Sequence, residues 1–134
     1  MTTGTSLTGS SRAFFDALAP HRARDLRRHR VYYQDRLRWL TTFLQPDASV
    51  VELGCGIAPV LRHLPQQKKT GIDFSVEMLK FAKEADPKGE YIQDDVSTLT
   101  HHQKYDVVLL LDTIDRLGAV PSSLQSRRDH LCHY

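Results

Sequence analysis

A glycine-rich turn between two short apolar segments, with the aspartate that ends the second segment, is the strongest candidate for a functional site in this sequence. The apolar run at 50–53 leads into Gly54-Cys55-Gly56, and a second apolar segment ends in Asp73, about 20 residues further on. Glycines let a backbone approach a ligand closely, and a carboxylate at the end of the next strand can hold both hydroxyls of a ribose. This spacing predicts a site for a nucleoside-containing ligand at the carboxyl edge of a parallel sheet.

The segments that must position this turn alternate between strand-like and helix-like patterns. Strands are predicted over 49–53, 69–73, 90–93 and 105–111, the last of them apolar on both faces as in a central parallel strand. Helices are predicted over 12–18, 21–44, 59–64, 75–86 and 121–131. Pro46 ends the helix at 21–44, and Ser75 is placed to cap the helix at 75–86, whose Met78, Leu79, Ala82 and Ala85 are predicted to face the sheet. The order predicts an α/β fold, a parallel sheet with helices on both faces.

Composition sets the bounds on function. The chain has 134 residues, enough for one domain, and its 40% hydrophobic and 25% charged residues are ordinary for a globular protein. A net charge of +2 is too small to indicate a nucleic acid or a membrane as partner, and no apolar run approaches the roughly 20 residues of a membrane span. Two cysteines, at 55 and 132, do not indicate a disulfide framework, which favours the cytoplasm. Residues 1–10 are small and polar and predict a disordered tail.

Two kinds of ligand compete for the glycine turn. A dinucleotide-binding turn needs a third glycine where this chain has Pro59, so an NAD(P)-dependent oxidoreductase is the weaker alternative. The chain instead offers an acidic residue, two glycines and a small residue at alternating positions, which are Glu52, Gly54, Gly56 and Ala58. A ligand without phosphate would not require a full anion nest from this turn.

Four segments, in order, resemble the motifs of class I S-adenosylmethionine (SAM)-dependent methyltransferases. They are 52–58, 71–75 with Met78, 91–96 and 105–114, and the resemblance covers about residues 12–120. Phe14-Phe15-Asp16 and Val31-Tyr32-Tyr33 resemble the N-terminal cover helices of members that act on small molecules. The resemblance implies a Rossmann-like fold, SAM as cofactor and a small-molecule methyl acceptor. No catalytic acid or base is predicted, because transfer from a sulfonium requires positioning more than proton transfer.

The resemblance also implies roles for individual residues. Asp73 would bind both ribose hydroxyls, Asp95 would face the adenine amino group, and Val96 would cover the ring. Glu52 would hold the turn or reach the methionine ammonium, and the strand end near Leu111 would lie beside the methionine. The full expected cofactor site is Tyr33, Glu52, Gly54, Cys55, Gly56, Asp73, Phe74, Met78, Asp95, Val96 and Leu111.

Alternatives remain for several of these residues. Asp94 could replace Asp95, Tyr33 is more typical of a core residue, and Cys55 is more typical of a small packing residue than of a nucleophile. The arginines at 22, 24, 27, 28, 30, 36 and 38 are typical of a solvated helix face, and a surface that binds an acidic substrate or an RNA is the alternative. His130, Cys132 and His133 do not have the spacing of a metal site.

The fold predicted in this way is incomplete. It comprises N-terminal helices at 11–46, a cofactor-binding α/β half at 47–120 and a short C-terminal helix at 121–134, with about four of the family's seven strands. The strand at 105–111 would then be an edge strand with unpaired backbone groups. We therefore expect a fragment or truncated isoform, an oligomer that shares strands, or a partner that completes the sheet. The alternative function is a non-catalytic SAM-binding or partner-binding module.

Overall fold

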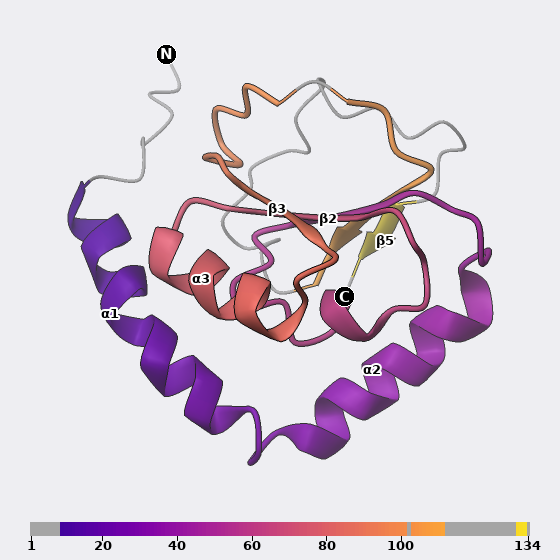
Figure 1. Ribbon diagram of the computed structural model, residues 1–134, viewed down its shortest axis with the longest axis horizontal. Coiled ribbons are helices and arrows are strands. Elements are labelled where there is room, and N and C mark those ends of the chain that lie inside the picture. Colours follow the sequence, from indigo (N-terminus) through magenta and orange to yellow (C-terminus); the bar gives the residue numbers. More distant parts are fainter. Residues whose placement is uncertain (1–8, 102, 112–130, 134) are drawn as a thin grey trace.

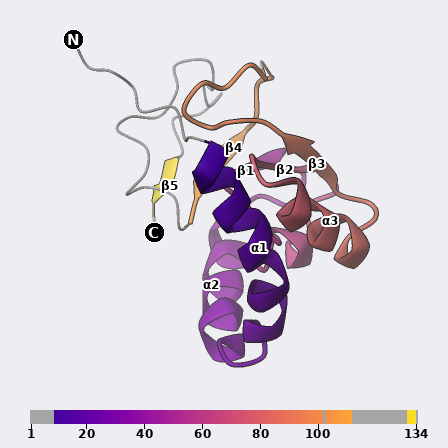
Figure 2. The same cartoon turned by 90° about the vertical axis from the view of Figure 1, so that its left-hand side faces the viewer.

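A parallel five-stranded sheet forms the centre of the protein in a computed structural model, which describes residues 9–101, 103–111 and 131–133. Its strands are β1 (Val50–Leu53), β2 (Lys69–Asp73), β3 (Glu90–Gln93), β4 (Val107–Leu110) and β5 (Leu131–His133). Their order in the sheet is β3-β2-β1-β4-β5, which Figure 2 shows from right to left. The four predicted strands are confirmed. Because the order reverses between β1 and β4, ligands are expected outside the carboxyl ends of these strands.

The fifth strand corrects two predictions. Residues 131–133 pair in parallel with β4, from Val108 opposite Leu131 to Leu110 opposite His133. The helix predicted over 121–134 is therefore wrong for these three residues, and 112–130 lie outside the described residues. The predicted unpaired edge at 105–111 is also wrong, because β4 is bonded to β1 on one side and to β5 on the other. All four residues of β4 are buried, and its pairing on both sides gives its backbone N–H and C=O groups hydrogen-bond partners.

Two long helices precede the sheet, and they divide at a place that the sequence did not predict. Helix α1 (Gly9–Asp25) continues through Pro20, and α2 (Arg30–Phe43) follows after a turn; the two meet at an angle below the sheet (Figure 1). The predicted helix at 21–44 is therefore wrong at 26–29, where the chain turns: residues 21–25 are helical but belong to α1, and the rest of the prediction corresponds to α2. Leu26 packs in the cluster that contains Ala19 of α1, whereas Leu40 and Leu44 pack against the sheet. A single straight helix could not contact both surfaces.

The remaining helices are short and lie close to the glycine turn. A single turn of 3-10 helix, η1 (Leu61–His63), occupies the place of the helix predicted at 59–64. Helix α3 (Val76–Ala85) begins at Ser75, whose Oγ accepts a hydrogen bond from the Met78 N–H at 3.2 Å, as predicted for its cap. Met78, Leu79 and Ala82 are buried, as predicted. Ala85 is exposed, so the prediction that it faces the sheet is wrong.

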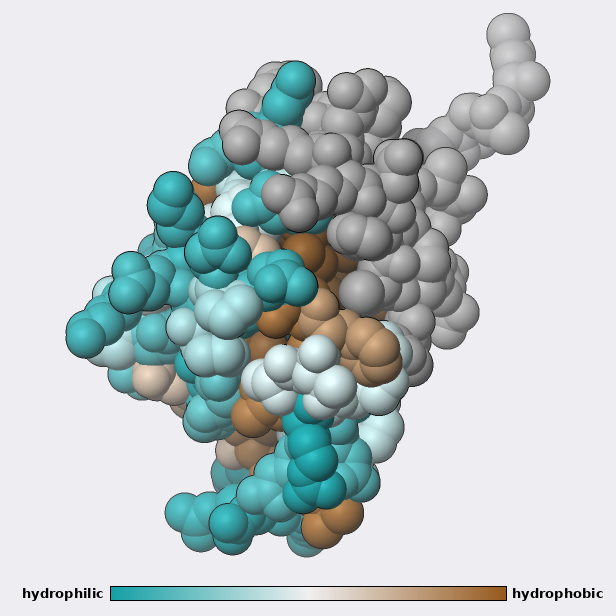
Figure 3. Space-filling model, turned by 90° about the vertical axis from the view of Figure 1, so that its right-hand side faces the viewer, coloured by the Kyte–Doolittle hydropathy of each residue, from teal (hydrophilic) through white to brown (hydrophobic). Residues whose placement is uncertain are grey.

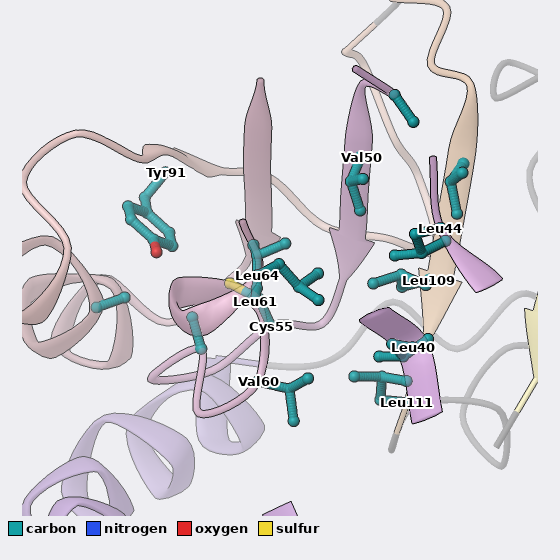
Figure 4. Packing of buried hydrophobic residues seen from close by; sticks show 14 of the residues in the cluster. Leu40, Leu44, Val50, Cys55, Val60, Leu61, Leu64, Tyr91, Leu109 and Leu111 are labelled. Atoms are coloured by element: carbon teal, nitrogen blue, oxygen red, sulfur yellow. The ribbon is translucent and has the colours of Figure 1, made fainter. Parts of the chain in front are cut away.

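The core has two layers, one on each face of the sheet. On the helix face, residues of α2, η1 and α3 pack against β1 and β4, among them Leu40, Leu61, Leu79, Val50 and Leu109 (Figure 4). The opposite face is packed by Val96, Leu99 and Tyr105, from the segment that connects β3 to β4. All helices of the described residues lie on one side of the sheet (Figure 1), so the prediction of helices on both faces is met on one face only.

Candidate functional site

The glycine turn leaves the carboxyl end of β1 in an unusual backbone conformation. Gly54, Gly56 and Ala58 have φ of 67°, 56° and 55°, in the left-handed region that disfavours residues with a Cβ by about 1–2 kcal/mol. The turn is fastened to β2, because Gly54 N–H and Cys55 N–H both donate to the Ile72 carbonyl, at 2.7 and 3.1 Å. Ala58 therefore adopts the backbone that a glycine would have at the third small position of the motif.

Asp73 joins this turn to the start of α3. One of its carboxylate oxygens, Oδ2, accepts a hydrogen bond from the Gly56 N–H at 2.8 Å, and the other, Oδ1, accepts one from the Ser75 N–H at 2.9 Å. The residue is only 6% exposed, and a carboxylate is a strong hydrogen-bond acceptor. The structure thus brings Gly54, Gly56 and Asp73 together at one edge of the sheet. This edge is where the sequence predicted the ligand.

Phe74 and Met78, also expected at the site, lie between Asp73 and helix α1. The Phe74 ring packs edge to face on Phe15, with the ring centroids 5.2 Å apart. Met78 is buried in a cluster with Ala19 of α1 and Ile57 of the glycine turn. Both residues therefore contribute to the packing of α1 against the site.

Two adjacent acids, Asp94 and Asp95, follow β3. The Asp94 carboxylate accepts hydrogen bonds from the loop in which it lies. Its Oδ2 accepts hydrogen bonds from Thr100 N–H, Thr100 Oγ and His101 N–H, at 2.9, 2.9 and 3.0 Å, and its Oδ1 accepts one from Asp95 N–H at 2.8 Å. Partial burial opposes ionisation, but these hydrogen bonds prevail and lower the pKa of Asp94. Asp95 is half-buried, and its Oδ1 accepts from Ser97 N–H and Oγ. Both acids thus take part in loop structure, Asp94 through both carboxylate oxygens and Asp95 through Oδ1, and Asp95 stays the candidate for the ligand.

The side chains of Cys55, Glu52 and Val96 are buried. The Cys55 thiol packs in the helix-face core beside Leu61 and Leu64 (Figure 4). Burial first, and then the negative charges of Glu52 and Asp73, raise the pKa of this thiol well above its ordinary value. Cys55 therefore stays protonated and does not have the character of a nucleophile. Val96 packs in the core of the opposite face, next to the loop that holds Asp95.

Helix α2 reaches the carboxyl end of β4 through one arginine. Arg36 donates a hydrogen bond from Nη1 to the carbonyl of Leu111 at 3.0 Å, and its guanidinium lies 4.3 Å from the centre of the Tyr32 ring. Arg36 is half-buried and thus departs from the solvated arginine face predicted for this stretch, whereas the other six arginines are exposed. Tyr33 is half-buried and packs against the helix-face core.

The surface on the α2 side of the molecule mixes apolar and hydrophilic side chains (Figure 3). Tyr32, Trp39 and Phe43 are exposed along α2 to 45%, 37% and 60%. Within the described part of the chain, no three potential ligands gather as a metal site would require, and no helix is long and apolar enough to cross a membrane.

Comparison with known proteins identifies the family of the chain. Residues 50–131 match the family model described as a methyltransferase domain, and the chain belongs to this family. Trans-aconitate 2-methyltransferase of Azoarcus sp. (strain BH72) is 40% identical over 57 residues, which are 40% of this chain and 22% of that protein.

Solved structures share the fold. A SAM-dependent methyltransferase of Thermotoga maritima, a possible histamine N-methyltransferase, matches with a TM-score of 0.63 and 21% identity, over 78% of this chain and 49% of its own. The DhpI–SAH complex matches with a TM-score of 0.64 and 23% identity, over 75% of this chain and 50% of its own. This chain thus spans about half the length of these two structures and a smaller part of the curated relative.

Proposed function

We propose that this chain binds SAM at the carboxyl ends of β1 and β2 and that the protein transfers the SAM methyl group to a small-molecule acceptor. One observation carries the proposal: the buried Asp73 carboxylate lies between the glycine turn and the start of α3, held by Gly56 N–H and Ser75 N–H. The position is next to the point where the strand order reverses, the usual ligand position in such sheets. A complex of the relative DhpI with SAH, the demethylated form of SAM, supports the choice of ligand.

The residues present fit this cofactor. Two N–H donors, of Gly56 and Ser75, orient the Asp73 carboxylate, and a carboxylate is the kind of acceptor that suits the hydroxyls of a ribose diol. The left-handed backbone at Gly54 and Gly56 needs no Cβ, so a ligand can approach the main chain closely.

The other residues of the expected site are assigned roles on the same basis. Asp95 accepts a hydrogen bond from the adenine amino group, with Val96 beside it, and Glu52 acts beneath the turn. Leu111 and Tyr33 border the methionine side, where Arg36 joins α2 to β4. Bound SAM supplies an electrophilic methyl group on sulfur, and the protein holds the acceptor in line with that bond.

The acceptor is proposed to be a small molecule because the N-terminal helices, α1 and α2, lie near the site, as expected for cover helices. We also propose a reducing, cytoplasmic location, which agrees with the buried free thiol of Cys55.

Calorimetric titration of the complete chain with SAH tests the binding step. Asp73→Asn should weaken SAH binding about tenfold or more, because it removes the charge from hydrogen bonds to the diol. Asp47→Asn is the matched control, an exposed acid that precedes β1, and it should leave the affinity unchanged. Unchanged affinity in Asp73→Asn would contradict the assignment. Tight binding of NAD with no binding of SAH would favour an oxidoreductase, and SAH binding without methyl transfer to any acceptor would favour a non-catalytic module.

A further inference from the structure

Helix α1 is joined to the candidate cofactor site by a chain of hydrogen bonds that runs through one serine. Asp16, on α1, accepts a hydrogen bond through Oδ1 from the Ser75 hydroxyl at 2.5 Å and a longer one from the Glu77 N–H at 3.4 Å. The Ser75 N–H donates to Asp73 Oδ1 at 2.9 Å, and Asp73 Oδ2 accepts from the Gly56 N–H at 2.8 Å. The order of contacts is therefore α1, the α3 cap, the end of β2 and the glycine turn.

The hydroxyl of the serine at the centre of this chain of contacts both donates and accepts a hydrogen bond. Ser75 is fully buried, and its Oγ also accepts the hydrogen bond from the Met78 N–H that caps α3. Its single hydroxyl proton is therefore committed to Asp16. Removal of the Asp16 carboxylate would leave a buried donor unpaired, and Ser75 could pair it only by turning away from its present geometry.

Apolar contacts hold α1 in the same place. Phe15 packs edge to face on Phe74, the residue that directly follows Asp73, and Ala19 is buried in one cluster with Met78. The two carboxylates, Asp16 and Asp73, both lie at the start of α3, where the helix dipole favours negative charge.

We propose that Asp16 is a positioning residue that sets the orientation of the Asp73 carboxylate through Ser75, so that α1 is part of the cofactor site. The proposal rests on the proposed function, since it assumes that Asp73 binds the ribose diol. Asp16 contacts no ligand itself in this account. Substitution of Asp16 should therefore change only the part of the SAH affinity that comes from the ribose diol.

Two probes separate this effect from a general loosening of the fold: SAH and its 2′-deoxy analogue, which lacks one hydroxyl of the diol. The wild-type chain should bind SAH about tenfold more tightly than the analogue, the value of a charge-assisted hydrogen bond. Asp16→Ala should lower this ratio about threefold or more, because it disturbs a group in the same network. Calorimetry of the complete chain gives both affinities, and circular dichroism checks the fold.

Two further variants complete the design. Asp16→Asn keeps an oxygen that accepts the Ser75 proton, so it should retain most of the preference for SAH over the analogue and serves as the second variant if Asp16→Ala does not fold. Asp25→Asn changes an exposed acid at the C-terminal end of α1 and should leave both affinities unchanged.

The outcomes are distinct. An equal loss of affinity for both probes in Asp16→Ala, or a loss of the preference in Asp16→Asn as large as in Asp73→Asn, would show a structural role and overturn the proposal. An unchanged ratio in Asp16→Ala would overturn it as well. A wild-type chain that binds neither probe would instead contradict the proposed function.

Discussion

Gly71, in the middle of β2, is required by the close approach of two side chains rather than by its backbone angles. A Cβ at this position would lie 2.7 Å from Cys55 Sγ and 2.7 Å from Cδ1 of Tyr91. Tyr91 is the neighbour of Gly71 on β3, and its hydroxyl donates to Asp86 Oδ2 at 2.9 Å, which limits how far the ring can withdraw. Cys55 belongs to the glycine turn, so pressure on its sulfur is transmitted to the candidate site.

Gly71→Ala should therefore destabilise the protein although alanine is favoured over glycine in strands. Overpacking of a core by one methyl group costs about 1–3 kcal/mol, and relief of the backbone entropy of glycine returns about 0.5–1 kcal/mol. The expected net loss is about 1–2 kcal/mol, a fall in Tm of about 4–7 °C for a chain of this size. Thermal and urea unfolding followed by circular dichroism measure this loss.

A double-mutant cycle with Cys55→Ala tests the cause. Removal of the sulfur opens space for the new methyl group, so the double variant should be more stable than the sum of the single losses by about 0.5 kcal/mol or more. A Gly71→Ala protein as stable as the wild type would refute the reasoning, and so would strict additivity in the cycle.

Two further predictions follow from the perturbed titrations. Asp94 has its pKa lowered in the folded state, so its ionised form stabilises the fold above the ordinary value of 3.8, and this contribution is lost as the pH falls below that value. Asp94→Asn should therefore flatten the dependence of the unfolding free energy on pH below about 4, and an unchanged acid limb of the unfolding curve would count against the role of Asp94 in its loop. The Cys55 thiol has a raised pKa and is buried, so a Cys132→Ser variant should react with Ellman's reagent at pH 8 only on unfolding; rapid reaction of the native protein would contradict this placement.

The strands could be predicted from the sequence because each is a short apolar segment with a clear end. β2 and β3 have the predicted bounds, and β1 and β4 are shortened by one to three residues. The division between α1 and α2 could not be predicted, because the turn after Asp25 contains neither glycine nor proline. Leu26, Leu37 and Leu40 keep the spacing of one helical face across this turn, so the sequence pattern indicates a single helix. In the structure the two helices pack on different surfaces.

The arrangement of the candidate site could be predicted where the motif consists of consecutive residues and could not where contacts cross the fold. The spacing of Gly54, Gly56 and Asp73 predicts that they lie together, and the structure brings them to one edge of the sheet. Asp16 is nearly sixty positions from Ser75 in the sequence, and no local pattern indicates their hydrogen bond. β5 escaped prediction because three residues carry too little periodicity to distinguish a strand from the end of a helix.

The central claim is that the cofactor lies between the glycine turn and Asp73, and amide NMR of the labelled chain during titration with SAH tests it most directly. The account predicts that the largest shifts fall on Gly54, Gly56, Ser75 and Asp95, while the exposed face of α2 around Trp39 changes little. Shifts that spare the glycine turn and concentrate on α2 would contradict the claim.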